Sequence, residues 1–338
     1  MTDEAAEIAR ILDLIRPGTP DTFQQRFRSA GELIFADRSD DSSFLRKFLS
    51  VVIESDEQFP NADTLFEQAI CSLDEIDLRE LAARVSASSR PVPEIASLIA
   101  SQVPDAFPVA ALRQLTDYRW WLGSPNPLAN QIAWHFAFEG PPPATKVSWR
   151  KRLHPTWSLP AKGEIVVVGG KSAVRCLACG RPRVHLVTLN AVPKGLGVSL
   201  DRLKLETCAN CPGPAFFSHD QEGEPNQISP LPEASFDFDK VYPIPRSARL
   251  APTPQRWTRQ IWGVGGQNLF RIGGLPSWIQ YPEIPMVPGS EHPMSFLAQF
   301  DSFLDAGNGD VFLWGSGGLL YVFWDDETRT SCTFAQWT

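Results

Sequence analysis

The sequence has few of the residues and segments that mark membrane or secreted proteins. Only 3 of its 338 residues are methionine, and no run of about 18 apolar residues is present. The absence of such a run excludes a membrane-spanning helix. The first ten residues, MTDEAAEIAR, are acidic and lack the basic and apolar regions of a secretion signal. We therefore expect a cytoplasmic protein with no membrane partner.

Signatures of catalysis are also missing. Neither a G-x-S-x-G nucleophile motif nor an H-E-x-x-H metal motif occurs. The few histidines are scattered, without a nucleophile at motif spacing, at positions 135, 154, 185, 219 and 292. The glycines of VVVGGKS are reminiscent of a phosphate-binding loop, but Ile165 stands where that loop requires its first glycine. These absences favour a protein that is not an enzyme.

Charge is unevenly distributed along the chain. Residues 1–120 hold 21 acidic and 12 basic residues, whereas the remainder is nearly balanced. Between Lys146 and Arg183 there are nine bases and one acid, and three of the bases are consecutive: Arg150, Lys151 and Arg152. Such a stretch suits nucleic acid or an acidic partner. It is also consistent with a solvated surface, or with contact to the acidic half of the same chain.

The pattern of apolar residues predicts an α+β protein. Apolar residues recur at helical spacing in six early segments: 3–15, 43–53, 64–70, 77–85, 94–103 and 110–118. Residues 1–119 are therefore expected to form an acidic helical domain. Residues 120–163, rich in proline and tryptophan, are expected to connect it to a β-rich domain over 164–338. Strands are expected at 165–168, 184–189 and 203–207, with two more within 312–323.

Four cysteines form the strongest motif. Cys176 and Cys179 make one C-x-x-C pair, and Cys208 and Cys211 make a second pair after 28 intervening residues. Two thiolates three positions apart in a tight turn can bind one ion, and two such turns supply the four sulfurs of a tetrahedral zinc site. The intervening residues suit a hairpin, so we predict a zinc ribbon over 174–214 with one structural zinc per chain.

Other roles for these cysteines fit less well. A redox C-x-x-C opens a helix, whereas both pairs here lie in turn and strand sequence. Disulfides are rare in the expected compartment. An iron–sulfur cluster also takes four cysteines and stays open as an alternative. With four sulfur ligands, no position remains for an activated water, so the site is predicted to be structural.

Two segments near the C-terminus carry a family resemblance. Together with CLACGRP and LETCANCPG, the segments NLFRIGGLPSWIQYPEIP and PMSFLAQFD resemble the YwqG-like family of bacterial domains. That family is distantly related to the eukaryotic programmed cell death protein 2 group. The resemblance covers about residues 120–338 and implies no catalytic residue. It implies a protein-binding role, either as an immunity protein or as a client-specific chaperone.

The chain departs from zinc-rich members of that family. They carry a second pair of cysteine turns, and the matching positions here are Val287, Ser290, Asp325 and Thr328. The resemblance therefore implies a single metal site, with the other end of the sheet held by packing alone.

The expected function is binding of another protein without catalysis. Aromatic residues are enriched in binding surfaces, and the candidate surface on the β-rich domain comprises Trp278, Gln280, Phe296, Gln299 and Phe300. The same residues are also consistent with a hydrophobic core. The alternative function is a zinc-ribbon protein that binds nucleic acid through the basic stretch 146–183.

Overall fold

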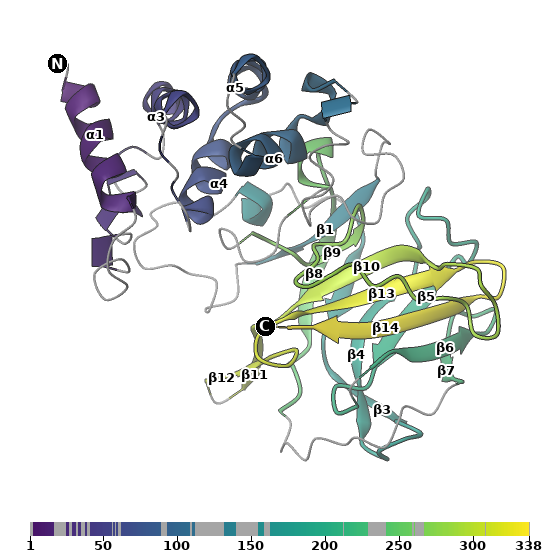
Figure 1. Ribbon diagram of the computed structural model, residues 1–338. Helices are drawn as coiled ribbons and strands as arrows, with labels where there is room; N and C mark the ends of the chain where they lie inside the picture. The colour runs from purple at the N-terminus through teal and green to yellow at the C-terminus, as the bar shows by residue number, and fades with distance from the viewer. Residues whose placement is uncertain are drawn as a thin grey trace. The chain divides into compact units, whose positions relative to one another are not determined.

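The computed structural model confirms an α+β protein. It describes residues 3–16, 25–26, 29–31, 33–34, 38, 41–55, 57, 59, 62–88, 93–108, 110–111, 132–139, 155–158, 163–211, 213–228, 241–258, 260, 267–307 and 309–337. The described residues divide into two compact units, one with the helices and one with every strand (Figure 1). Among them, no helix is both long and apolar enough to span a bilayer.

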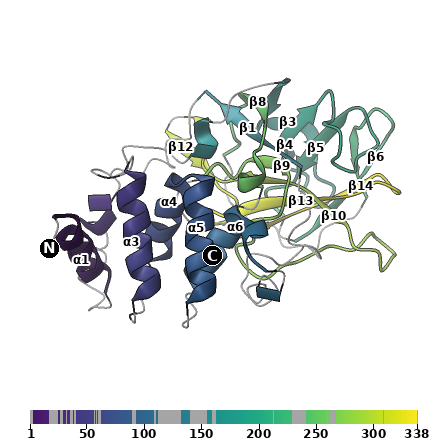
Figure 2. The same ribbon diagram turned by 90° about the horizontal axis from the view of Figure 1, so that it is seen from above.

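The helical unit consists of short amphipathic helices. They are α1 (Asp3–Ile15), α3 (Ser42–Glu54), α4 (Asp63–Ser72), α5 (Glu75–Ala87) and α6 (Pro93–Gln102), followed by a short 3-10 turn at Pro104–Ala106. Helices α3 and α5 lie side by side (Figure 2). Each predicted helix up to residue 103 is present, because apolar residues at a 3.6-residue period form one buried stripe. The sixth predicted helix, 110–118, lies almost entirely outside the described residues.

Two aspartates fix where helices of this unit begin. The Asp41 carboxylate accepts a hydrogen bond from the Phe44 amide at the start of α3, at 3.0 Å. The Asp74 carboxylate accepts one from the Asp77 amide at the start of α5, at 2.9 Å. Each carboxylate satisfies an N–H group that has no partner within its helix. Phe44 then begins the buried stripe of α3.

The β unit contains a large, mostly antiparallel sheet. Its strands are β1 (Ala133–Phe138), β2 (Ile165–Val168), β3 (Lys171–Arg175), β4 (Pro182–Leu189), β5 (Leu203–Thr207), β6 (Ala215–His219), β7 (Pro225–Gln227), β8 (Arg246–Pro252), β9 (Arg271–Gly273), β10 (Ser295–Asp301), β13 (Leu319–Asp325) and β14 (Thr330–Gln336). A separate hairpin joins β11 (Leu304–Gly307) to β12 (Asp310–Phe312). A short 3-10 turn occurs at Gln255–Trp257, whereas a second one, at Pro155–Ser158, belongs to the helical unit.

The sheet curls until its two ends meet. Its strand order is β3-β4-β2-β8-β1-β9-β10-β13-β14-β6-β7, with β5 paired to β4. The backbone N–H of Lys204 in β5 donates to the carbonyl of Gly223, between β6 and β7, at 3.0 Å. The hydroxyls of Thr207 in β5 and Thr333 in β14 are 2.7 Å apart. A seam therefore runs between β5 and the β14-β6-β7 end.

Two parts of the β unit differ from the prediction. Strand β1 comes from the middle of the segment 120–163, yet it pairs with β8 and β9 inside the sheet. Residues 133–138 therefore belong to the β unit and not to a connection. The two strands expected within 312–323 are present as β12 and β13, but they do not pair with each other: β12 pairs with β11, and β13 lies between β10 and β14.

Candidate metal centre

The first cysteine turn lies between β3 and β4. The amide of Cys176 donates to the carbonyl of Arg181 at 2.8 Å, and the amide of Gly180 donates back to the carbonyl of Cys176 at 2.9 Å. Gly180 has φ of 67°, a left-handed conformation that glycine adopts without steric cost. These bonds close a tight loop that holds Cys176 and Cys179 on the same side.

The second turn crosses the seam of the sheet. It leaves β5 at Thr207 and enters β6 at Ala215, and these strands belong to opposite ends of the sheet. The amide of Asn210 points at the Cys208 sulfur from 3.4 Å. One cysteine turn follows β3 and the other joins β5 to β6. A metal bound by both turns would therefore hold the two ends of the sheet together.

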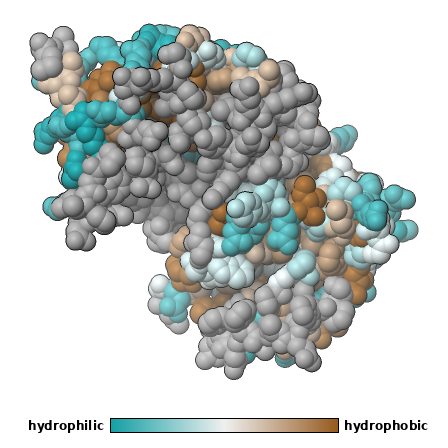
Figure 3. Space-filling model, in the orientation of Figure 1, coloured by the Kyte–Doolittle hydropathy of each residue, from teal (hydrophilic) through white to brown (hydrophobic). Residues whose placement is uncertain are grey.

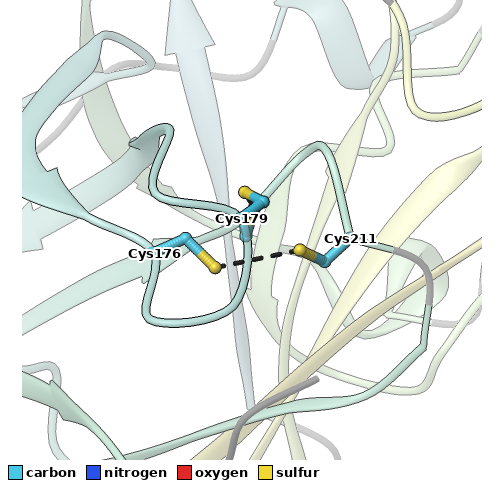
Figure 4. A group of neighbouring side chains, drawn as sticks. Cys176, Cys179 and Cys211 are labelled. Atoms are coloured by element: carbon cyan, nitrogen blue, oxygen red, sulfur yellow. Dashed lines mark hydrogen bonds between the residues drawn. The ribbon is translucent and has the colours of Figure 1, made fainter. Parts of the chain in front are cut away.

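The four sulfurs converge. All four lie within 4.8 Å of one another. The Cys176 and Cys211 sulfurs are 3.8 Å apart and face each other (Figure 4), and those of Cys179 and Cys208 are 3.5 Å apart. A disulfide would need about 2.05 Å. A tetrahedral ion with bonds of about 2.3 Å separates its sulfurs by about 3.8 Å. The site therefore fits a single ion, and its four thiols are free.

The electrostatics of the cluster favour a bound cation. The Cys176 sulfur is stabilised as a thiolate by its hydrogen bond with Cys208, which lowers the pKa of Cys176 and raises the pKa of Cys208. Burial raises the pKa of Cys211. Thiolates this close repel one another, and a divalent cation among them removes that repulsion and keeps all four deprotonated.

A side chain from the other end of the sheet makes a hydrogen bond to one of the sulfurs. The Gln227 side chain in β7 directs its Nε2 at the Cys176 sulfur from 3.8 Å, and its Oε1 accepts a hydrogen bond from the amide of Leu177 at 3.1 Å. Hydrogen bonds of this kind orient metal ligands and tune their charge. Gln227 carried no signal in the sequence, because only the curl of the sheet brings β7 to the first cysteine turn.

A buried arginine lies beside the cluster. Arg183 Nη1 is 3.6 Å from Glu206 Oε2, and its guanidinium stacks over the Phe217 ring at 5.2 Å. Phe217 in turn packs against the cysteines. Glu206 balances the charge of Arg183, and the stacked guanidinium holds the Phe217 ring against the cysteines.

The described histidines near the motif make hydrogen bonds. His185 contacts the carbonyl of Gly169 at 3.0 Å and the hydroxyl of Thr188 at 2.9 Å. His219 contacts the Ser331 hydroxyl at 2.8 Å. Both imidazoles therefore have hydrogen-bond partners within the β unit. Within the described residues, the four cysteines are the one group of three or more potential ligands that converges in this way.

The predicted protein-binding surface is largely wrong. Trp278 is 4% exposed, and Gln299 and Phe300 are fully or almost fully buried. Trp278 stacks on Phe323 with ring centroids 6.0 Å apart, so it belongs to the core between the turn and β13. Phe296 is partly buried against the same core, and among the five predicted residues Gln280 alone is exposed.

Polar residues of the same segments make hydrogen bonds within the core. The Gln299 side chain accepts from the amide of Ser277 at 2.9 Å and donates to the carbonyl of Leu269 at 2.9 Å. The Ser277 hydroxyl donates to the carbonyl of Gln260 at 2.7 Å, and the Tyr321 hydroxyl donates to the carbonyl of Ser277 at 2.8 Å. These bonds tie the GGLPSW turn to β10 and β13. The motif therefore has a structural explanation.

The four positions that the resemblance matched to a second pair of cysteine turns lie in two turns of this chain. The amide of Ser290 donates to the carbonyl of Val287 at 2.9 Å, and the Asp325 carboxylate accepts from both the amide and the hydroxyl of Thr328. His292 Nε2 lies 3.8 Å from Asp325 Oδ1. This end of the sheet is therefore held by hydrogen bonds as well as by packing.

The predicted basic patch of Arg150, Lys151 and Arg152 lies outside the described residues. Three described bases of the same stretch make contacts within the β unit. Lys171 lies over the Tyr242 ring, Arg175 donates to the carbonyl of Gly180 at 2.8 Å, and Arg183 is buried.

Comparison with known proteins gives no relative. No family model, no curated protein and no solved structure matches the chain.

Proposed function

We propose that this protein binds another protein, catalyses no reaction, and uses one zinc ion to hold its β unit together. The observation that carries the proposal is the closed set of four thiols at the seam of the sheet. Four protein ligands fill a tetrahedral shell, so no position is left for a water or a substrate. Such a site stabilises a fold and performs no chemistry.

Zinc is the ion that this site suits best. Sulfur separations of 3.5 and 3.8 Å match a single tetrahedral ion. An iron–sulfur cluster of several irons places sulfide and metal atoms between its cysteines and would hold the four sulfurs further apart. Zinc also prefers four thiolates in a tetrahedron and undergoes no redox change. A single iron has the same geometry and is distinguished by metal analysis.

The resemblance to the YwqG-like family supports a binding role. Its matching segments form the turn at Gly273–Gln280 and strand β10, and their buried residues hold the fold. A shared role in the core would explain why these segments resemble those of the family, and it requires no catalytic residue. We propose, on this basis, that the protein acts as an immunity protein or as a client-specific chaperone.

Affinity capture tests the proposed function. The tagged full-length chain, expressed in its native host, should retain a specific protein partner in high salt, because an apolar interface is little affected by screening. The runner-up is nucleic-acid binding through the basic triplet. It would give RNA or DNA binding that weakens steeply with salt, with a slope reduced by Arg150→Ala, Lys151→Ala and Arg152→Ala. That result would replace protein binding with the runner-up.

A further inference from the structure

The four cysteines of the metal centre differ in their accessibility. Cys176 and Cys208 are 2% and 6% exposed, whereas Cys179 and Cys211 are partly exposed. The two buried sulfurs also accept hydrogen bonds, Cys176 from a side chain in β7 and Cys208 from a backbone amide of its own turn. A hydrogen bond to a thiolate stabilises its charge and lowers its nucleophilicity. The partly exposed cysteines are therefore expected to be the more reactive ones, and each turn contributes one of them.

A cavity gives small molecules access to Cys211. It has a volume of about 570 Å³, and its lining includes the second cysteine turn from Cys208 to Cys211, residues 311–316 and parts of β13 and β14. The described residues of the first cysteine turn do not line it. Val241 and Val311 line it and are 40% and 37% exposed, so the cavity opens to solvent. A small molecule can therefore approach Cys211 from this side.

The cavity favours an uncharged visitor. Apart from Cys208 and Cys211, the described residues that line it have no ionisable side chain. Four thiolates around a divalent ion carry a net negative charge, so they repel an anionic oxidant. A small uncharged molecule such as hydrogen peroxide loses no ionic hydration on entering such walls. Accessible thiolates are the groups that peroxide oxidises.

The sulfur that faces Cys211 belongs to the other cysteine turn. The sulfurs of Cys176 and Cys211 are 3.8 Å apart (Figure 4). A disulfide needs about 2.05 Å, so the two turns would have to approach by about 1.8 Å. Both residues lie in connections, one between β3 and β4 and the other between β5 and β6, and connections adjust more readily than paired strands. Cys176 is therefore placed to form a disulfide with an oxidised Cys211.

We propose that Cys211 is a peroxide-sensitive thiolate, and that its oxidation joins it to Cys176 and releases the metal ion. The inference rests on the zinc ion of the proposed function and goes beyond its structural role, because the ligands react and the ion does not. Hydrogen peroxide is the co-reactant, and it reaches Cys211 through the cavity.

The reaction consumes one peroxide and two protons. The Cys211 thiolate attacks one oxygen, the O–O bond breaks, hydroxide leaves and is protonated to water, and the sulfur becomes a sulfenic acid. The Cys176 thiolate then attacks the Cys211 sulfur, the S–O bond breaks, and a second hydroxide leaves and is protonated. Two thiolates are thereby oxidised by two electrons to one disulfide, and the peroxide is reduced to two waters. Zinc then dissociates, because two of its four ligands are lost.

The pair of cysteines that is joined determines what happens to the sheet. A disulfide between Cys176 and Cys211 links the turn after β3 to the connection between β5 and β6, as the metal does. A disulfide within the second turn, between Cys208 and Cys211, would leave the first turn unlinked. The oxidised chain should therefore lose its metal and keep its fold, and a thiol reductant with zinc should restore the site.

Oxidation of the zinc-loaded full chain with hydrogen peroxide tests the proposal. A chromogenic chelator reports zinc release, and mass spectrometry of unreduced peptides locates the disulfide. We expect release of about one zinc per chain, with Cys176 and Cys211 joined in the first disulfide. Cys332 is fully buried in the core and should stay a thiol. Retention of zinc in a large excess of peroxide, or a first disulfide between any other pair, overturns the proposal.

Two valines of the β unit give a matched pair of variants for the role of the cavity. Val311, in the cavity wall, and Val167, on β2 outside it, are 37% and 43% exposed. Val311→Trp narrows the cavity and should slow zinc release by peroxide at least about threefold, whereas Val167→Trp should leave the rate unchanged. Zinc content before oxidation reports whether each variant is folded. Equal rates in Val311→Trp and the parent protein would overturn the cavity as the route. If Val311→Trp does not fold, the disulfide found in the parent protein decides alone.

The same experiment separates this inference from the proposed function. Absence of zinc from the untreated parent protein would contradict the structural zinc itself. A parent protein that contains zinc and keeps it in peroxide would leave the proposed function standing and overturn only the oxidation of Cys211.

Discussion

The two units of this protein are stabilised in different ways. In the helical unit, described ion pairs at the surface link the helices: Arg46 with Asp77 at 2.9 Å, and Arg84 with Glu54 at 3.0 Å, both join α3 to α5. In the β unit, buried polar side chains make hydrogen bonds with one another, as Arg271 does with Gln260 at 2.7 Å. Figure 3 shows hydrophobic and hydrophilic side chains interspersed over the described surface in view.

The difference concerns how far apart in the chain the interacting residues lie. Helices need residues three and four apart, so each helix is specified by its own segment. The β unit depends on groups far apart in sequence, such as Thr207 with Thr333 and Cys176 with Gln227. Loss of one long-range contact should therefore affect the β unit as a whole, whereas loss of one surface contact should affect the helices little.

Removal of the metal should have the largest effect. Apparent zinc-binding energies of about 10–16 kcal/mol in small fingers are comparable to the whole stability of a typical domain, about 5–15 kcal/mol. Cys208→Ser should therefore release the ion and abolish protection from hydrogen exchange in β4 to β6. Helices α1 to α5 should stay protected. Cys332→Ser is the control, since Cys332 is buried in β14 away from the cluster. Equal loss of protection in both units would show that the metal does not act locally.

Truncation of Trp278 should have the next largest effect. Its ring is 4% exposed in the core, so Trp278→Ala should lower the free energy of unfolding by about 3–5 kcal/mol. Tyr281, three residues later, is 79% exposed, and Tyr281→Ala should change it by about 0.5 kcal/mol or less. Chemical denaturation of both variants checks this. Similar values for the two would contradict the burial of Trp278.

A buried carboxyl should make the β unit less stable as pH rises. Burial raises the pKa of Asp301 to about 7 from its ordinary 3.8. The folded state therefore binds the proton more tightly, and this contribution is present at low pH and is lost between about pH 4 and pH 7. Asp301→Asn keeps the oxygen that accepts from the Ser302 amide. The variant should gain about 1–3 kcal/mol over the parent at pH 8 relative to pH 5.

Thermal unfolding of the parent and Asp301→Asn at the two pH values measures that gain. All other ionisable groups are the same in both proteins, so their contributions cancel in the difference. A difference that is the same at pH 5 and pH 8 would show that Asp301 does not titrate with a raised pKa.

The smallest effect is expected in the helical unit. The Arg84–Glu54 pair joins α5 to α3 at 3.0 Å, and both side chains are more than a third exposed. Such pairs contribute about 0.5 kcal/mol or less and are weakened by salt. Arg84→Met should therefore change the melting temperature by about 2 °C or less. A larger loss that persists in high salt would indicate packing by the arginine stem.

The sequence was informative where structure is local. The helices up to residue 103 follow from apolar spacing, and β2 and β5 have the predicted limits. The C-x-x-C pairs predicted the four converging thiols, because each pair forms its own turn. Their hydrogen-bonding partner Gln227 could not be predicted, since no local pattern places β7 beside the first turn.

The main error was the expectation that these aromatic residues form a binding surface, because most of them are buried. Trp278 and Phe300 have the composition of either a core or an interface, and sequence spacing does not distinguish the two. The pairing of β10 with β13 distinguishes core from interface, because this pairing places Phe300 opposite Leu320 within the sheet. Strand β1 was missed for a related reason. It lies in a segment rich in proline and tryptophan, and its partners β8 and β9 follow more than 100 residues later.

Metal analysis of the purified full-length chain tests the central claim most directly. Elemental mass spectrometry on protein prepared without added metal should find about one zinc per chain, since four converging thiolates form one tetrahedral site. The same measurement on Cys208→Ser should find none, and on Cys332→Ser one. Iron in place of zinc, or no metal in the parent protein, would contradict a structural zinc at the seam of the sheet.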